Sequence, residues 1–170
     1  AASTATTSVW AQPEVWPDKP IKFVLSQPPG SGPDNVARLI GDRLGKSLGQ
    51  SIVIDNKPGG QNVIGAQAAA RSAPDGYTFY FATTAALITN ALLFKQLAYD
   101  PQKDFVPVAF IARSPFAILV DAGSPIQSID DLIAKSKASS GQFSIGNEGP
   151  RTFSGMIARL FNARSGAAAN

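Results

Sequence analysis

A regular alternation of short apolar runs with helical segments begins at Ile21 and constrains the fold more than any other feature. Strand-like runs cover 21–26, 51–55 and 77–83, and turns rich in Gly or Pro link them to helical patterns over 34–48, 63–72 and 85–94. This βαβαβ order with short connections predicts an α/β fold. We expect an open, mostly parallel sheet that helices cover on both faces.

The alternation changes between 101 and 105. Strand-like runs at 106–112 and 117–120 leave no room for a helix between them, and a third run follows at 143–146. A capping box beginning at Ser128 predicts a helix to about 137, and a further helix is expected over 152–164. We therefore divide the chain into three parts: an N-terminal arm or leader remnant (1–20), a first lobe (21–104) and the opening of a second lobe (105–170).

The N-terminal arm admits two interpretations. Small and polar residues followed by prolines are typical of a loose arm. The segment Ser8-Val9-Trp10-Ala11 also matches the small-residue end of a secretory leader whose charged and apolar parts are absent from this sequence. We favour the second interpretation and expect an exported, periplasmic protein.

Composition restricts the chemistry. The chain has no His and no Cys, which excludes imidazole catalysis, thiolate nucleophiles, His- or Cys-ligated metals and lipid attachment through Cys. Its 15 basic and 12 acidic side chains are scattered, which argues against nucleic acid as a partner. No apolar run approaches the roughly 18 to 20 residues that cross a bilayer, so we expect a soluble chain without a membrane span.

Ligands of parallel α/β sheets bind outside the carboxyl ends of the strands, so the loops after the strands are the candidate sites. The loop after 21–26 supplies five candidate residues: Pro29, Gly30, Ser31, Gly32 and Asp34. Glycines expose backbone N–H groups there, and the start of a helix favours an anion. The alternative is an ordinary tight turn in which Asp34 caps the first-turn amides of the helix.

Two further loops carry candidate residues. Thr83 and Thr84 follow the third strand and offer two hydroxyls, although an ordinary helix N-cap explains them equally. The last loop contributes Asn147, Glu148, Gly149, Arg151 and Thr152. A cation near a helix start is unfavourable, which suggests that Arg151 serves an anion, with pairing to Glu148 as the alternative.

Two enzyme classes are alternatives to a binding role. Gly30-Ser31-Gly32 with Asp55 resembles part of a dinucleotide fingerprint, so a nucleotide-binding Rossmann-like oxidoreductase fragment is the alternative function. Asn35 stands where the third glycine belongs, and Pro33 intrudes. Ser154 lacks the G-x-S-x-G context, and no His is present to activate it. We expect no enzymatic activity.

With these residues in view, the chain resembles the substrate-binding receptors of tripartite tricarboxylate transporters, also called the Bug family. The resemblance extends from about residue 16 to 161. It rests on ordered motifs: Trp16-Pro17-Asp18-Lys19-Pro20-Ile21, Pro28-Pro29-Gly30 with Asp34 and Ala37-Arg38, Val53 to Gly60 with Ile64-Gly65-Ala66, Ala73-Pro74-Asp75-Gly76-Tyr77-Thr78, Tyr99-Asp100-Pro101 with Asp104-Phe105, and Gly146 to Thr152.

The resemblance implies a type II periplasmic-binding-protein fold, in which two α/β lobes close on a small carboxylic acid. Backbone groups and ordered water in the loops matching 28–34 and 147–152 would hold the carboxylate without a cofactor or metal. A membrane permease would be the partner. Such receptors are considerably longer, so we expect a truncated or partial chain with an incomplete second lobe. Where many relatives have Gly and then His, this chain has Arg151 and Gly155.

Overall fold

The computed structural model describes residues 15–139, 142–149, 152–167 and 169. It divides into two compact units, Ala1–Ala82 and Thr83–Asn170. The lobe boundary expected between 104 and 105 stays a prediction. No described helix is both long enough and apolar enough to cross a membrane.

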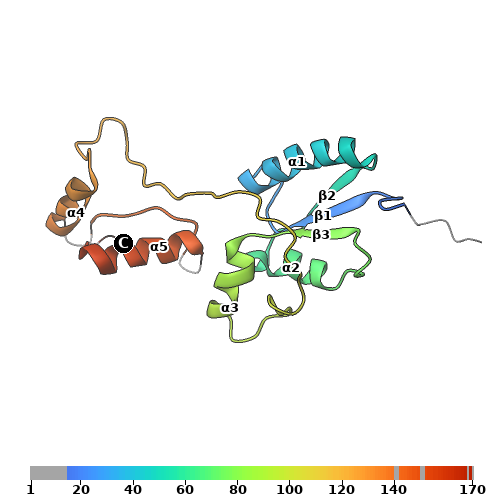
Figure 1. The fold of residues 1–170 in the computed structure, drawn as a ribbon. Coiled ribbons are helices and arrows are strands. Elements are labelled where there is room, and N and C mark those ends of the chain that lie inside the picture. The colour runs from blue at the N-terminus through green and yellow to red at the C-terminus, as the bar shows by residue number, and fades with distance from the viewer. Residues whose placement is uncertain (1–14, 140–141, 150–151, 168, 170) are drawn as a thin grey trace, which may run out of the picture. The chain divides into compact units, whose positions relative to one another are not determined.

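The first unit is built around a parallel sheet. Its elements are β1 (Ile21–Leu25), α1 (Gly32–Leu48), β2 (Ile52–Asn56), the 3-10 turn η1 (Gly60–Asn62), α2 (Val63–Ala70) and β3 (Thr78–Phe81). The strand order is β2-β1-β3, and Phe23 of β1 is in register with Ile54 and Phe79. Helices α1 and α2 lie on opposite faces of the sheet (Figure 1). The predicted βαβαβ unit and the α/β fold class are therefore confirmed.

The core lies along β1 because this strand is central and covered on both faces. Ile21, Phe23 and Leu25 are buried, and Ala37 of α1 packs against them. The ring of Phe23 contacts that of Phe79 edge-on at 6.0 Å between centroids. These long-range contacts fix the sheet whose carboxyl edge carries the first candidate loop.

Close approach of α2 to the end of β1 depends on a glycine. A Cβ added to Gly65 would lie 2.4 Å from Ser26 Oγ, 2.9 Å from Ser26 Cα and 3.1 Å from the carbonyl oxygen of Lys57. No larger residue fits without moving backbone atoms. Gly65 therefore sets how closely α2 covers the start of the loop after β1.

The described part of the N-terminal arm is attached to the first unit. The side chain of Lys19 pairs with Asp75 at 3.2 Å, and its Nζ lies 4.2 Å from the centre of the Tyr77 ring. The backbone N–H of Asp18 donates to the Tyr77 hydroxyl at 3.0 Å. Residues 15–20 are thus attached next to the sheet and do not form a loose arm. The leader motif at 8–11 lies outside the described residues.

The second unit contains a π-helical turn η2 (Ala85–Thr89) continuing into α3 (Asn90–Leu93), then α4 (Ile129–Ala138) and α5 (Phe153–Ser165). The helix start predicted at Ser128 is confirmed, since the Ser128 hydroxyl accepts from the Asp131 N–H at 3.1 Å. In place of the reciprocal bond of a capping box, the Asp131 carboxylate accepts from the Gln127 N–H at 3.1 Å. The hydroxyl of Tyr99 donates to the carbonyl of Ala86, which attaches the chain after α3 to η2.

The strands expected at 106–112, 117–120 and 143–146 are absent, and this expectation was wrong. These segments have no strand pairing, and Val106 and Phe110 are 85% and 79% exposed. An apolar β-branched run favours an extended backbone, but a strand also needs a hydrogen-bonded neighbour. The described part of the chain supplies no such neighbour for these segments.

Candidate functional site

The first candidate loop joins β1 to α1 and presents an open face. Gly30 has φ +81°, a left-handed conformation that favours glycine. A Cβ at Gly30 or Gly32 would meet no atom within 4 Å, so both glycines border open space. The backbone of Ser31 forms the N-cap of α1, but its side chain makes no capping hydrogen bond. A small ligand therefore has room to approach the start of the helix.

Asp34 lies behind this open face. Its carboxylate is only 1% exposed. One oxygen, Oδ2, accepts from the Gly30 N–H at 2.8 Å and from Arg38 Nε at 2.9 Å. The other, Oδ1, accepts from Asn56 Nδ2 at 2.9 Å. These donors, with the Arg38 guanidinium contributing most, hold the pKa of the Asp34 carboxyl far below its usual range.

This geometry differs from the capping role weighed for Asp34. The carboxylate accepts from Gly30, which precedes the N-cap Ser31, instead of from the first-turn amides of α1. The Gly30 N–H is consequently occupied by a side chain of the protein. In the first turn of α1, Pro33 has no N–H and the Asn35 N–H donates to the Ser31 carbonyl at 2.9 Å, so Gly32 and Asp34 supply the amides that helix geometry leaves without intrahelical acceptors.

A polar cluster beneath the loop was not among the expected site residues. The Ser26 hydroxyl lies 2.6 Å from the Tyr80 hydroxyl and donates to the carbonyl of Asn62 at 3.0 Å. Gln27 Nε2 donates to Asn62 Oδ1 at 3.0 Å. Asn56 Nδ2 also donates to the carbonyl of Gln27 at 3.0 Å. The sequence could have indicated this cluster, because Ser26 and Gln27 directly follow one strand and Asn56 ends the next, which places all three at the carboxyl edge of the sheet.

The second candidate loop begins the second unit. The carbonyl of Thr83 accepts from the N–H groups of Ala86 and Leu87 at 3.1 and 3.2 Å, which starts η2. Thr84 is exposed and takes the N-cap position without a side-chain capping bond. The ordinary side-chain cap considered for this loop is therefore not formed by Thr84.

The third candidate loop precedes α5 and is closed by its own side chains. Asn147 Oδ1 accepts from the Gly149 N–H at 2.9 Å. The hydroxyl of Thr152 donates to the Gly149 carbonyl at 2.8 Å and accepts from the Gly155 N–H at 3.2 Å, which caps α5. The hydroxyl of Ser154 donates to Glu148 Oε2 at 3.1 Å. Arg151 lies outside the described residues.

Gly155 is enclosed by this loop. A Cβ at this position would lie 2.1 Å from the carbonyl oxygen of Gly149 and 3.2 Å from Asn147 Oδ1. The loop conformation seen here therefore requires glycine at 155, where many relatives are expected to carry His.

Within each unit the structure thus gathers expected residues into one network: Gly30 with Asp34 in the first unit, and Asn147, Glu148, Gly149 and Thr152 in the second.

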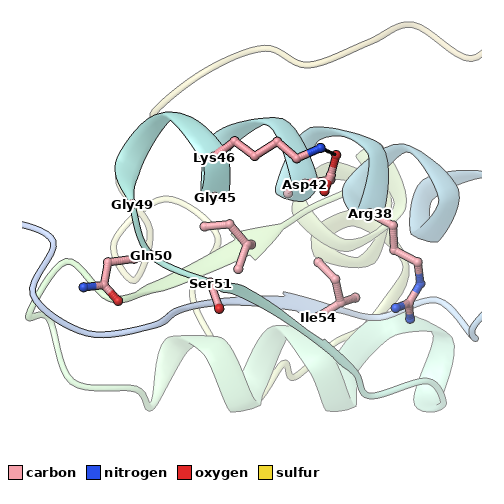
Figure 2. A pocket seen from close by; sticks show the side chains of 10 residues that line it. Arg38, Asp42, Gly45, Lys46, Gly49, Gln50, Ser51 and Ile54 are labelled. Carbon is pink, nitrogen blue, oxygen red and sulfur yellow. Dashed lines mark hydrogen bonds and ion pairs between the residues drawn. The ribbon is translucent and has the colours of Figure 1, made fainter.

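Elsewhere in the first unit, a surface hollow lies between α1 and β2 (Figure 2). Lys46 and Asp42 on its rim pair with each other at 2.7 Å, and Gly45 and Ile54 line it. None of the expected site residues lines this hollow. Among the described residues, no group of three or more acidic side chains has a metal-binding arrangement.

Comparison with known proteins identifies the class of protein. Residues 36–169 match the model of the tripartite tricarboxylate transporter family receptor. The match covers most of the chain, and the chain therefore belongs to this family of transporter receptors, which is not a family of enzymes. The family resemblance stated from the sequence motifs is confirmed.

Three individual proteins illustrate the similarity. A UPF0065 protein of Bordetella bronchiseptica is 40% identical over 156 residues, which are 92% of this chain and 46% of that protein. A protein of R. palustris solved with adipate is 34% identical, with a TM-score of 0.83 over 91% of this chain and 52% of that one. MatC from Rhodopseudomonas palustris, solved with bound malate, is 28% identical, with a TM-score of 0.76 over 91% and 53%. The chain spans about half the length of the relatives it matches.

Proposed function

We propose that the protein carrying this sequence is a periplasmic receptor that captures a small organic acid for a tripartite tricarboxylate-type transporter. Support comes from the family match and from two structural relatives solved with the dicarboxylic acids adipate and malate. The observation that carries the proposal is the open face of Gly30 and Gly32 at the start of the 17-residue helix α1. Such a face suits a carboxylate.

The proposed binding site is built from residues of the three loops, some of which contact the acid while others hold the loops in place. These residues are Pro29, Gly30, Ser31, Gly32 and Asp34, then Thr83 and Thr84, and finally Asn147, Glu148, Gly149, Arg151 and Thr152. The first set leads into α1 and includes its first residues, and the third set leads up to Thr152, the N-cap of α5. Arg151 contributes a guanidinium that contacts a second carboxylate or a planar polar group.

Capture proceeds by closure of two lobes, the first over 21–104 and the second opening over 105–170. Closure excludes water and strengthens the hydrogen bonds to the acid. The loaded receptor then delivers the acid to the membrane permease subunits of the transporter. A leader ending near residue 11 would export the protein to the periplasm, and a structural relative 32% identical to this chain is described as a periplasmic transporter.

Calorimetric titration of the purified protein with adipate, malate and an aromatic acid tests the proposal, with NAD and NADP as competing probes. We expect saturable binding of at least one acid and no response to the nucleotides. Binding of the nucleotides alone would support the Rossmann-like alternative instead. Binding of neither class would contradict the receptor function.

A matched pair of variants tests the site. Gly32→Asp places a carboxylate at the start of α1, and Gly32→Asn adds a side chain of nearly the same size without charge. Because a Cβ at Gly32 meets no atom within 4 Å, both variants are expected to fold. An anion site predicts at least about tenfold weaker binding for Gly32→Asp than for Gly32→Asn. Equal affinities would place the carboxylate elsewhere.

A further inference from the structure

Asp34 stands in an unusual position for a residue of an anion site. It carries a negative charge three residues into α1, the end of the helix at which an anionic ligand is proposed to bind. Its carboxylate is nonetheless buried, and its two oxygens together accept three hydrogen bonds. A group so enclosed is not available to a ligand.

The three donors to Asp34 come from three different elements. Gly30 belongs to the loop after β1, Arg38 lies one turn further along α1, and Asn56 is the last residue of β2. Arg38 also donates to Asn56 Oδ1 at 3.2 Å, and Asn56 donates back to the Gln27 carbonyl at the start of the same loop. The carboxylate therefore joins both halves of the loop to the helix and to the neighbouring strand.

The other described hydrogen bonds of this turn are longer: Asn35 Nδ2 donates to the Gly30 carbonyl at 3.4 Å, and the Ser31 N–H donates to the Pro28 carbonyl at 3.3 Å. The φ of Gly30, +81°, is accessible to glycine but not enforced by it, and no atom lies where a Cβ would be. The 2.8 Å bond from the Gly30 N–H to a charged acceptor selects one conformation of the loop. The Arg38 guanidinium balances the Asp34 charge, so the start of α1 is not made repulsive to an acid.

We infer that Asp34 is a positioning residue: it holds the Gly30 loop in its binding conformation through Gly30, Arg38 and Asn56, and does not itself touch the ligand. That this loop conformation binds the ligand rests on the proposed function. That Asp34 holds the loop in this conformation is a statement about the free protein. The inference also assigns Arg38 and Asn56 to the site as supporting residues. Neither was among the residues expected to bind the ligand.

The same helix offers a matched control. Asp42 and Lys46 form an i,i+4 ion pair at 2.7 Å, the same spacing as Asp34 and Arg38, but both side chains are exposed. Asp34→Asn replaces a charged acceptor by an amide that cannot accept all three bonds. Asp42→Asn makes the same chemical change away from the loop. Arg38→Gln replaces the charged guanidinium, which donates to both Asp34 and Asn56, by a shorter neutral amide at a half-exposed position, and it serves as the second variant if Asp34→Asn does not fold.

Two measurements on these variants test the inference. Amide hydrogen exchange at Gly30 by NMR reports the loop in the free protein, and calorimetry with adipate and malate reports binding at a temperature where each variant is folded. We expect Gly30 exchange to accelerate by about tenfold or more in Asp34→Asn, with binding weakened to a similar degree. Arg38→Gln should shift both quantities in the same direction by less, and Asp42→Asn should change neither.

The outcomes separate the inference from the proposed function. If Asp34→Asn lowers only the melting temperature and leaves Gly30 exchange and affinity within about twofold of the parent, Asp34 is merely structural and the inference is wrong. If Asp34→Asn does not fold, an Arg38→Gln protein that matches the parent in both measurements overturns it. If the parent binds no acid, the proposed function fails, and Gly30 exchange alone decides whether Asp34 holds the loop.

Discussion

The hydroxyl of Tyr77 donates to the carboxylate of Asp18 at 2.5 Å and joins residues 59 positions apart in the chain. The same hydroxyl accepts from the Asp18 N–H, and the hydrogen bond to Asp18 contributes most to raising the pKa of Tyr77. The Trp16 ring lies 6.1 Å from the Tyr77 ring between centroids. Tyr77, which immediately precedes β3, thus holds the segment leading into β1.

Tyr77→Phe should lower the melting temperature by about 2 to 4 °C, because it removes both hydrogen bonds and keeps the ring. Tyr77→Leu should lower it further, since the contacts with Trp16 and Lys19 are lost as well. Differential scanning calorimetry measures both variants. An unchanged melting temperature in Tyr77→Phe would mean that water replaces the hydroxyl without loss.

Leu25→Ala should destabilise the protein by about 2 to 5 kcal/mol, because Leu25 is fully buried at the end of the central strand. Val53→Ala on the edge strand β2 is the control. Val53 is 48% exposed, so its truncation should cost less than about 1 kcal/mol. Urea denaturation followed by circular dichroism gives both free energies. Similar values for the two variants would contradict the assignment of the core to β1.

Gly65→Ala should destabilise the protein by about 1 to 3 kcal/mol, because the added methyl group meets the side chain and backbone of Ser26. The corresponding change at the open position, Gly32→Ala, should alter the free energy of unfolding by no more than about 0.5 kcal/mol. Denaturant titration compares the two. A neutral Gly65→Ala would show that α2 moves away from β1 at little cost.

Acidification should destabilise the protein through carboxyls whose pKa is lower in the folded state. Hydrogen bonds lower the pKa of Asp34, Asp75 and Asp131, with Arg38, the Tyr77 N–H and Ser128 as the respective main donors. The native state therefore binds fewer protons than the unfolded state in acid. The resulting stability is fully present above the unfolded pKa of about 4 and is lost as pH falls through the folded values.

Thermal melts between about pH 2 and pH 6 measure this dependence. The melting temperature should rise with pH across the range, and the slope should be smaller in Asp34→Asn, which lacks one of the shifted groups. A variant slope equal to that of the parent would mean that Asp34 is not ionised within its hydrogen-bond network.

The sequence by itself determined the elements of the first unit and the family. Local periodicity placed β1, α1, β2, α2 and β3 within a few residues of their observed bounds, because strands and helices repeat their apolar side chains at different intervals. The cap at Ser128 was equally local, since it joins residues three positions apart. The loops after the strands were also identified, because a parallel sheet places its carboxyl ends at one edge.

Only the tertiary structure decided which hydrogen-bond partners the polar groups of those loops have. The Asp34 carboxylate turns back to Gly30 because Asn56, 22 residues away, lies next to β1 in the sheet register and offers a donor. Pairing likewise decided against strands at 106–112 and 117–120, whose local pattern favoured them. Hydrogen bonds between distant segments depend on register and on which neighbours are present, and short-range periodicity carries neither kind of information.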